Sequence, residues 1–203
     1  MSRYDNLFRI IKERKCKKIV DVGTFNGVHA KQMIETAIES SRRENVEYYG
    51  YDLFDDLTDK KYDEEFSKNP SVKERAENIL PSFDLVKTLL KQTHIKFILF
   101  KGDSKITLPQ TRHLIQGADF VFIDGGHSKK TIASDWSVIK TIMNENTIVV
   151  FDDYYHSIHK EKFGCNEIID NLNRNIYSVE ELYPIDFFSA NGVEVQMIAV
   201  KLK

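Results

Sequence analysis

The chain has 203 residues, of which 41% are hydrophobic and 30% are charged, and its formal net charge is −2. This length suits one domain with a sizeable core, so we expect a single domain over residues 1–203. A net charge near zero gives no general attraction for nucleic acid, and no apolar run approaches the ~20 residues that span a bilayer. We therefore expect neither a nucleic-acid partner nor a membrane location.

The N-terminal segment 1–18 is charged throughout and lacks the apolar core of an export signal. Cys16 and Cys165 lie far apart, outside the spacing of a disulfide framework or a thiolate zinc site. We expect two free thiols and a cytoplasmic location.

Short apolar runs rich in β-forming residues alternate with longer segments of helical period along the chain. This alternation is typical of an α/β fold, in which helices cover both faces of a mostly parallel sheet. The predicted strands, in chain order, are Lys18–Gly23, Glu47–Leu53, Lys96–Asp103, Asp119–Gly125 and Thr147–Asp153.

The segment between the second and third strands is highly charged and contains two prolines. We predict that it forms a lid-like insertion at about 55–82, followed by a helix over about 84–92.

The C-terminal part contains two strand-like runs, 178–189 and 193–202. Between them lies Asn191-Gly192, a strong signal for a tight turn. This pattern predicts a hairpin whose last strand runs antiparallel to its neighbour.

A glycine-containing motif, DVGTFNGVHA, follows the first strand and opens the next helix. In a doubly wound sheet, backbone amides at this position meet a nucleotide-like ligand, and Gly23 and Gly27 permit a close approach. The spacing is G-x-x-x-G rather than the G-x-G-x-x-G that binds a dinucleotide, which disfavours NAD. A tight turn without a ligand is the alternative.

Acidic residues follow the second and third strands. Asp52 ends the second strand, where a carboxylate can accept hydrogen bonds from both hydroxyls of a ribose. Asp103, in KGDS after the third strand, is placed to accept a hydrogen bond from the exocyclic amine of an adenine. Each acid alone could merely cap a helix. Acids at successive carboxyl ends of one sheet indicate a ligand site.

Together with FIDGGH after the fourth strand, these motifs resemble the class I S-adenosylmethionine-dependent methyltransferases over nearly the whole chain. The resemblance implies a Rossmann-like doubly wound sheet of seven strands in the order 3-2-1-4-5-7-6, with an antiparallel last strand. It also implies that S-adenosylmethionine is bound by Asp21 and Gly23 at its methionine end, by Asp52 at its ribose, and by Asp103 with Ser104 at its adenine.

The implied strand order places the fourth and fifth strands side by side, so that Asp124, Asp152 and Asp153 converge. Three carboxylates this close cannot all stay ionised cheaply without a cation among them. We predict that they form a metal site for Mg²⁺ or Mn²⁺, which prefer oxygen ligands. Because successive residues of a strand point to opposite faces, Asp152 and Asp153 can share a metal only if the chain leaves the regular strand there.

The acidic arrangement resembles that of the metal-dependent O-methyltransferases, both the catechol type and the sugar type. The DGGH motif is nearer the sugar type, and Asp153 stands where the catechol branch has asparagine, which disfavours a catechol substrate. The resemblance implies metal-assisted O-methylation of a hydroxyl group on a small-molecule substrate.

Asp124 and His127 are the predicted catalytic residues. His127 is either the base that takes the hydroxyl proton or a residue that only orients its loop. Three other functions remain open: a metal-independent methyltransferase in which Asp124 contacts the cofactor amine, an NAD-dependent oxidoreductase, and a non-catalytic Rossmann-like binding domain. The sequence leaves open the substrate and whether the chain forms a homo-oligomer.

Overall fold

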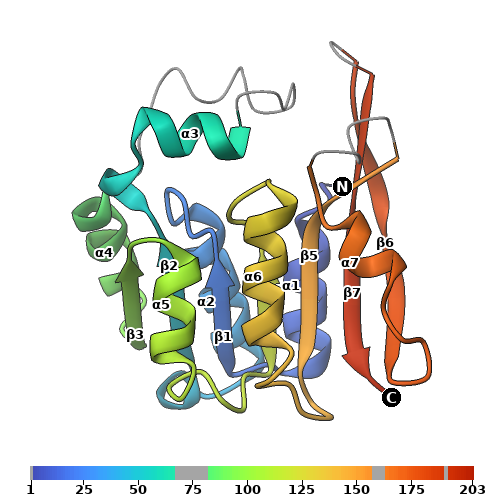
Figure 1. Ribbon diagram of the computed structural model, residues 1–203. Coiled ribbons are helices and arrows are strands. Elements are labelled where there is room, and N and C mark those ends of the chain that lie inside the picture. The colour runs from blue at the N-terminus through green and yellow to red at the C-terminus, as the bar shows by residue number, and fades with distance from the viewer. Residues whose placement is uncertain (1, 67–81, 157–162, 190–191) are drawn as a thin grey trace.

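The computed structural model of the chain describes residues 2–66, 82–156, 163–189 and 192–203. One sheet of seven strands runs through these residues in the order β3-β2-β1-β4-β5-β7-β6 (Figure 1). The strands are β1 (Lys18–Val22), β2 (Glu47–Asp52), β3 (Lys96–Lys101), β4 (Phe120–Ile123), β5 (Ile148–Tyr155), β6 (Tyr177–Phe188) and β7 (Val193–Leu202).

The strand directions confirm the predicted fold. Strands β1 to β5 pair in parallel, whereas β7 pairs antiparallel with both β5 and β6. The predicted strands differ from the observed ones only at their ends: β4 stops at Ile123, and β5 continues to Tyr155. Part of the predicted turn, residues 190–191, lies outside the described residues.

Helices cover both faces of the sheet (Figure 1). They are α1 (Asp5–Arg14), α2 (Val28–Ser40), α3 (Asp59–Phe66), α4 (Phe83–Lys91), α5 (Ser104–Thr111), α6 (Lys129–Ile139) and α7 (Asn166–Asp170), with short 3₁₀ turns η1 (Arg43–Asn45) and η2 (Phe54–Asp56). Among the helices of the described ranges, none is both long enough and apolar enough to cross a bilayer.

Two apolar cores arise because side chains alternate along each strand. Ile19 of β1 packs on one face with buried residues of α1, α2 and α4. Its neighbours Val20 and Val22 belong to the other core, with residues of α5, α6 and α7. The near-continuous apolar character of the parallel strands follows from burial on both faces.

The regular ladder of β5 is interrupted at its acidic pair. Phe151 is opposite Ile198 and Tyr154 is opposite Gln196, so β5 carries one more residue than β7 between these pairs, which is a β-bulge. Asp153 has a left-handed backbone, with φ of 61°. The chain therefore leaves the regular strand at the point where a shared site for Asp152 and Asp153 requires it.

Candidate active site

The turn after β1 brings the backbone against the loop that follows β4. Gly23 has φ of 105°, which L residues with a side chain rarely adopt. A Cβ on Gly23 would collide with the carbonyl group of Asp124 and lie 2.7 Å from Cα of Gly125. Gly27, with φ of 77°, stands at the N-terminus of α2. The sequence motif thus forms a tight glycine turn beside Asp124.

Asp21 is buried in β1, with 2% of its surface exposed. The Tyr48 hydroxyl donates a hydrogen bond of 2.5 Å to its Oδ2, while Oδ1 has no partner among the described residues. Burial raises the pKa of Asp21 to about 7. An unpaired buried acceptor is costly unless a donor reaches it, and a ligand ammonium group is such a donor.

The raised pKa of Asp21 predicts a pH-dependent stability. Between the unfolded pKa of about 4 and the folded pKa of about 7, the folded protein binds more protons, so the free energy of unfolding falls as pH rises. The substitution Asp21→Asn removes this pH-dependent fall in stability, because asparagine does not titrate. We expect urea denaturation to show that the stability of the variant relative to wild type increases by about 2–4 kcal/mol from pH 4.5 to pH 8. A difference that stays constant with pH would contradict the prediction.

Asp52 organises the loops around the end of β2. Its Oδ2 accepts a hydrogen bond from the Phe25 amide (2.7 Å) and its Oδ1 accepts one from the Phe54 amide (2.8 Å). Burial raises the pKa of Asp52, although these amides favour the charged carboxylate. Each carboxylate oxygen has two lone pairs, so acceptor capacity remains for a ligand hydroxyl.

Asp103 caps α5, whose first residue is Ser104. Its Oδ1 accepts a hydrogen bond of 3.0 Å from the Lys105 amide, and the ammonium groups of Lys105 and Lys61 lie at 3.3 Å and 3.5 Å from its carboxylate. Partial burial opposes the charge, but the Lys105 amide and these lysines lower the pKa of Asp103. The predicted adenine contact is therefore also a helix cap.

The described part of the predicted lid docks on the loop after β4. Glu65 of α3 is 9% exposed, and it accepts hydrogen bonds from the Ser128 amide (3.0 Å) and the Thr131 hydroxyl (2.5 Å). Both partners belong to the N-terminal end of α6. No sequence pattern distinguishes Glu65 from the many other acids of this charged segment. Residues 67–81 of the predicted lid lie outside the described residues.

Asp124, His127 and Asp153 form a compact cluster, in which one ligand atom from each residue lies within 4.8 Å of the others. Nδ1 of His127 is 2.9 Å from Oδ2 of Asp153, and the Tyr155 hydroxyl donates to Oδ1 of Asp153. Burial, followed by the charges of Asp152 and Asp153, raises the pKa of Asp124 well above its usual value.

In the His127–Asp153 pair, each side chain favours the charged form of the other. Burial opposes the charged form of His127, but the Asp153 carboxylate raises the pKa of the imidazole. Burial likewise disfavours the charge on Asp153, but His127 lowers the pKa of this carboxyl group. The geometry suits either a metal site or a base whose ring is oriented by a carboxylate.

Asp152, the third carboxylate of the predicted metal site, forms an ion pair with Arg3. Both of its oxygens accept hydrogen bonds from Arg3, at 3.0 Å and 2.9 Å, and the Tyr4 hydroxyl lies 3.3 Å from Oδ2. The structure therefore groups Asp124 and Asp153 with His127 and pairs Asp152 with an arginine. Sequence reasoning missed Arg3 and Tyr4, because a charged N-terminal segment carries no local signal that it will be buried.

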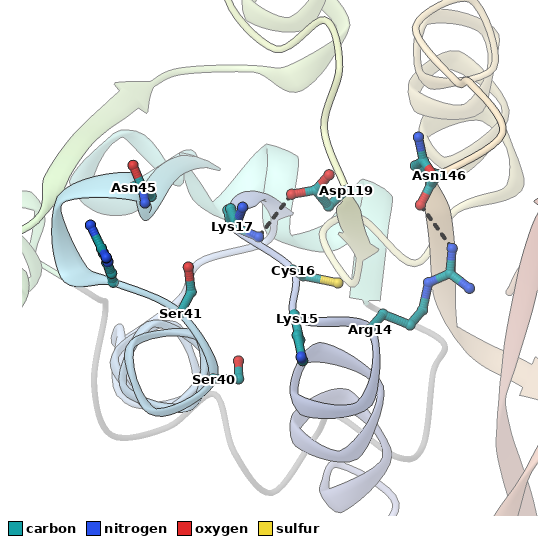
Figure 2. A pocket seen from close by; sticks show the side chains of 10 residues that line it. Arg14, Lys15, Cys16, Lys17, Ser40, Ser41, Asn45, Asp119 and Asn146 are labelled. Atoms are coloured by element: carbon teal, nitrogen blue, oxygen red, sulfur yellow. Dashed lines mark hydrogen bonds between the residues drawn. The ribbon is translucent and has the colours of Figure 1, made fainter.

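A cavity of ≈ 750 Å³ lies at the opposite end of the sheet, where the strands begin (Figure 2). Its polar lining includes Arg14, Lys15, Lys17 and Arg42. The Asp119 carboxylate there accepts a hydrogen bond of 2.8 Å from the Lys17 amide. This cavity contains none of the predicted site residues.

A family model described as "Methyltransferase domain" matches residues 20–154. This range contains every site residue predicted from the sequence, from Asp21 to Asp153. The chain belongs to this methyltransferase family. The predicted family and enzyme class are therefore confirmed.

Solved structures share the fold of this methyltransferase. An O-methyltransferase from Bacillus cereus in complex with S-adenosylhomocysteine has a TM-score of 0.60 and 14% identity, and the match covers 98% of this chain and 80% of that one. TomG from Streptomyces achromogenes, an O-methyltransferase in complex with S-adenosylmethionine, has a TM-score of 0.61 and 11% identity over 98% and 79%. A putative rRNA methylase from Clostridium thermocellum has a TM-score of 0.64 and 13% identity over 100% and 98%. No curated protein matches the methyltransferase.

Proposed function

We propose that the methyltransferase transfers the methyl group of S-adenosylmethionine to a hydroxyl group of a small molecule. The observation that carries the proposal is the position of Asp21, Asp52 and Asp103 at or just beyond the carboxyl ends of neighbouring strands, around the turn at Gly23. The Bacillus and Streptomyces neighbours, which are named O-methyltransferases and contain this cofactor or its product, support the choice of donor.

The residues fit this cofactor. The unpaired Oδ1 of Asp21 suits the ammonium group at the methionine end, and the carboxylate of Asp52 suits the ribose hydroxyls. Ser104 and the Asp103 carboxylate stand at the expected adenine end. When bound, the cofactor would supply an activated methyl group on a sulfonium centre, and these residues would hold that centre in place.

We also propose that Asp124, His127 and Asp153 hold Mg²⁺ or Mn²⁺. The two carboxylates supply the oxygen ligands that these ions prefer, and the imidazole adds a nitrogen ligand within 4.8 Å of both. A bound ion would orient the acceptor and lower the pKa of its hydroxyl group. In this proposal His127 replaces Asp152, the third carboxylate of the predicted set, because Arg3 engages both oxygens of Asp152.

A metal-independent methyltransferase is the second candidate, and the His127–Asp153 contact of 2.9 Å favours it. Asp153 would fix the imidazole ring and stabilise its charged form, while His127 takes the proton from the acceptor hydroxyl. Asp124 would then contact the cofactor amine.

A small acceptor is favoured over RNA, although one neighbour from Clostridium and one from Streptococcus are named rRNA methylases. At 13% and 10% identity, these similarities show a shared fold and give no information about the substrate. The net charge of −2 gives no general attraction for RNA. Glu65 also docks α3 on the N-terminal end of α6, beside the loop after β4.

Calorimetric titration with S-adenosylhomocysteine tests the donor. We expect one binding site in the wild type and, in Asp52→Ala, an affinity lower by about 1.5–3 kcal/mol, because a charged hydrogen-bond acceptor is lost. Asp119→Ala is the matched control, since Asp119 also accepts two backbone amides but lies at the far end of the sheet. Binding of NAD in place of S-adenosylhomocysteine, or equal affinities of Asp52→Ala and wild type, would contradict the proposal.

A further inference from the structure

Arg3 is buried at the edge of the acidic cluster, with 5% of its surface exposed. Its Nε and Nη2 atoms donate to the two oxygens of Asp152, and Nη1 donates to Asp186 of β6. Asp152 itself is 2% exposed. A guanidinium group that binds both oxygens of a buried carboxylate fixes its orientation and neutralises its charge.

The start of the chain is anchored so that Arg3 stays in this position. Asn6, which is 5% exposed, donates hydrogen bonds to the carbonyl oxygens of Arg3 (3.0 Å) and Tyr183 (2.9 Å). The Tyr4 ring stacks on His29, with centroids 4.1 Å apart, and the Tyr4 hydroxyl contacts Oδ2 of Asp152. The N-terminal segment is therefore built into the cluster through both α2 and β6.

We propose that Arg3 is a resident cation of the acidic cluster, which holds Asp152 as its ion-pair partner and restricts the divalent-cation site to Asp124, His127 and Asp153. The proposal rests on the metal site proposed above. It makes Arg3 a positioning residue, because Arg3 acts through Asp152.

A change in metal affinity follows from this arrangement. Without the Arg3 charge, the buried Asp152 carboxylate lies near Asp124 with its main counter-ion gone. A divalent cation then gains a carboxylate ligand and loses a neighbouring positive charge, and both changes favour its binding. Removal of a purely structural arginine would not tighten metal binding.

The experiment is a titration with Mn²⁺ alone, followed by calorimetry and by electron paramagnetic resonance. We expect Arg3→Gln to bind Mn²⁺ at least about tenfold more tightly than the wild type. Arg3→Gln combined with Asp152→Asn should return to the wild-type affinity, because the released carboxylate is absent. Arg14→Gln is the matched control, since Arg14 belongs to the same N-terminal region but donates to the carbonyl oxygen of Asn146, far from the acidic cluster.

The outcomes separate this proposal from the metal site on which it rests. Equal affinities of Arg3→Gln and a wild type that binds Mn²⁺ would overturn the role of Arg3 alone. Binding of Mn²⁺ by Arg3→Gln but not by the wild type would support the role of Arg3 and overturn the wild-type metal site. Binding of Mn²⁺ by neither protein would overturn both proposals. If Arg3→Gln folds only when Mn²⁺ is present, the ion replaces the guanidinium as proposed. Failure to fold even with Mn²⁺ would overturn the role of Arg3.

Discussion

Substitution of Asp153 by asparagine is expected to reduce methyl transfer by about 10²–10⁴-fold and to weaken Mn²⁺ binding in parallel. The amide keeps the size of the side chain but removes the negative charge that a cation and a protonated His127 both require. Oδ2 of Asp153 is also the atom that fixes Nδ1 of His127, at 2.9 Å. Transfer is measured as release of S-adenosylhomocysteine with the best acceptor from a panel of vicinal diols and sugars.

Asp170→Asn is the control for this substitution. The Asp170 carboxylate accepts a hydrogen bond of 3.0 Å from the Tyr154 hydroxyl, much as Asp153 accepts one from Tyr155, but it lies on α7 at an exposed position. We expect this variant to retain wild-type transfer.

Loss of transfer on chelation, with recovery in Mg²⁺ or Mn²⁺, would support the metal site. Full transfer in chelator together with a large loss in Asp153→Asn would favour the His127 base without a metal. Wild-type transfer by Asp153→Asn would contradict both mechanisms.

Substitution of Gly23 by alanine is expected to lower the free energy of unfolding by about 3–5 kcal/mol. The φ of 105° strains any residue that has a Cβ. The new methyl group would also collide with the backbone of Asp124 and Gly125, which cannot rotate away as a side chain could. Relief of this collision would separate the loops after β1 and β4, so we expect calorimetry to show loss of S-adenosylhomocysteine binding as well.

The variant Gly117→Ala separates the cost of backbone strain from the cost of the collision that Gly23→Ala creates. Gly117 also has a left-handed backbone, with φ of 71°, but a Cβ there would meet nothing within 4 Å. Its cost should be the backbone strain alone, about 1–2 kcal/mol. Urea denaturation of both variants gives the comparison. Equal losses would show that the contact between Gly23 and Asp124 adds nothing to stability.

Local patterns in the sequence determined most of the fold. Short apolar runs rich in β-forming residues predict strands, helical periods predict the covering helices, and these signals depend only on neighbouring residues. The carboxyl ends of parallel strands share one edge of the sheet, so Asp52 and Asp103 could be proposed for a common ligand site from their positions, whereas the place of Asp124 came from the strand order that the family resemblance implies. The hairpin of β6 and β7 could also be predicted from the sequence, because the Asn-Gly turn signal and the strand-like runs on either side of it are local features.

The pairing of charges within the site was decided only by the tertiary structure. Arg3 and Asp152 are 149 positions apart, and nothing near either residue in the sequence indicates that the other will be buried beside it. The bulge at Asp153 depends on the register between β5 and β7, and the docking of Glu65 depends on where α3 lies relative to α6. Burial makes an unpaired charge costly, so each carboxylate takes the donor that the complete fold brings within reach. The structure therefore groups Asp124 and Asp153 with His127, whereas the sequence suggested a group of Asp124, Asp152 and Asp153.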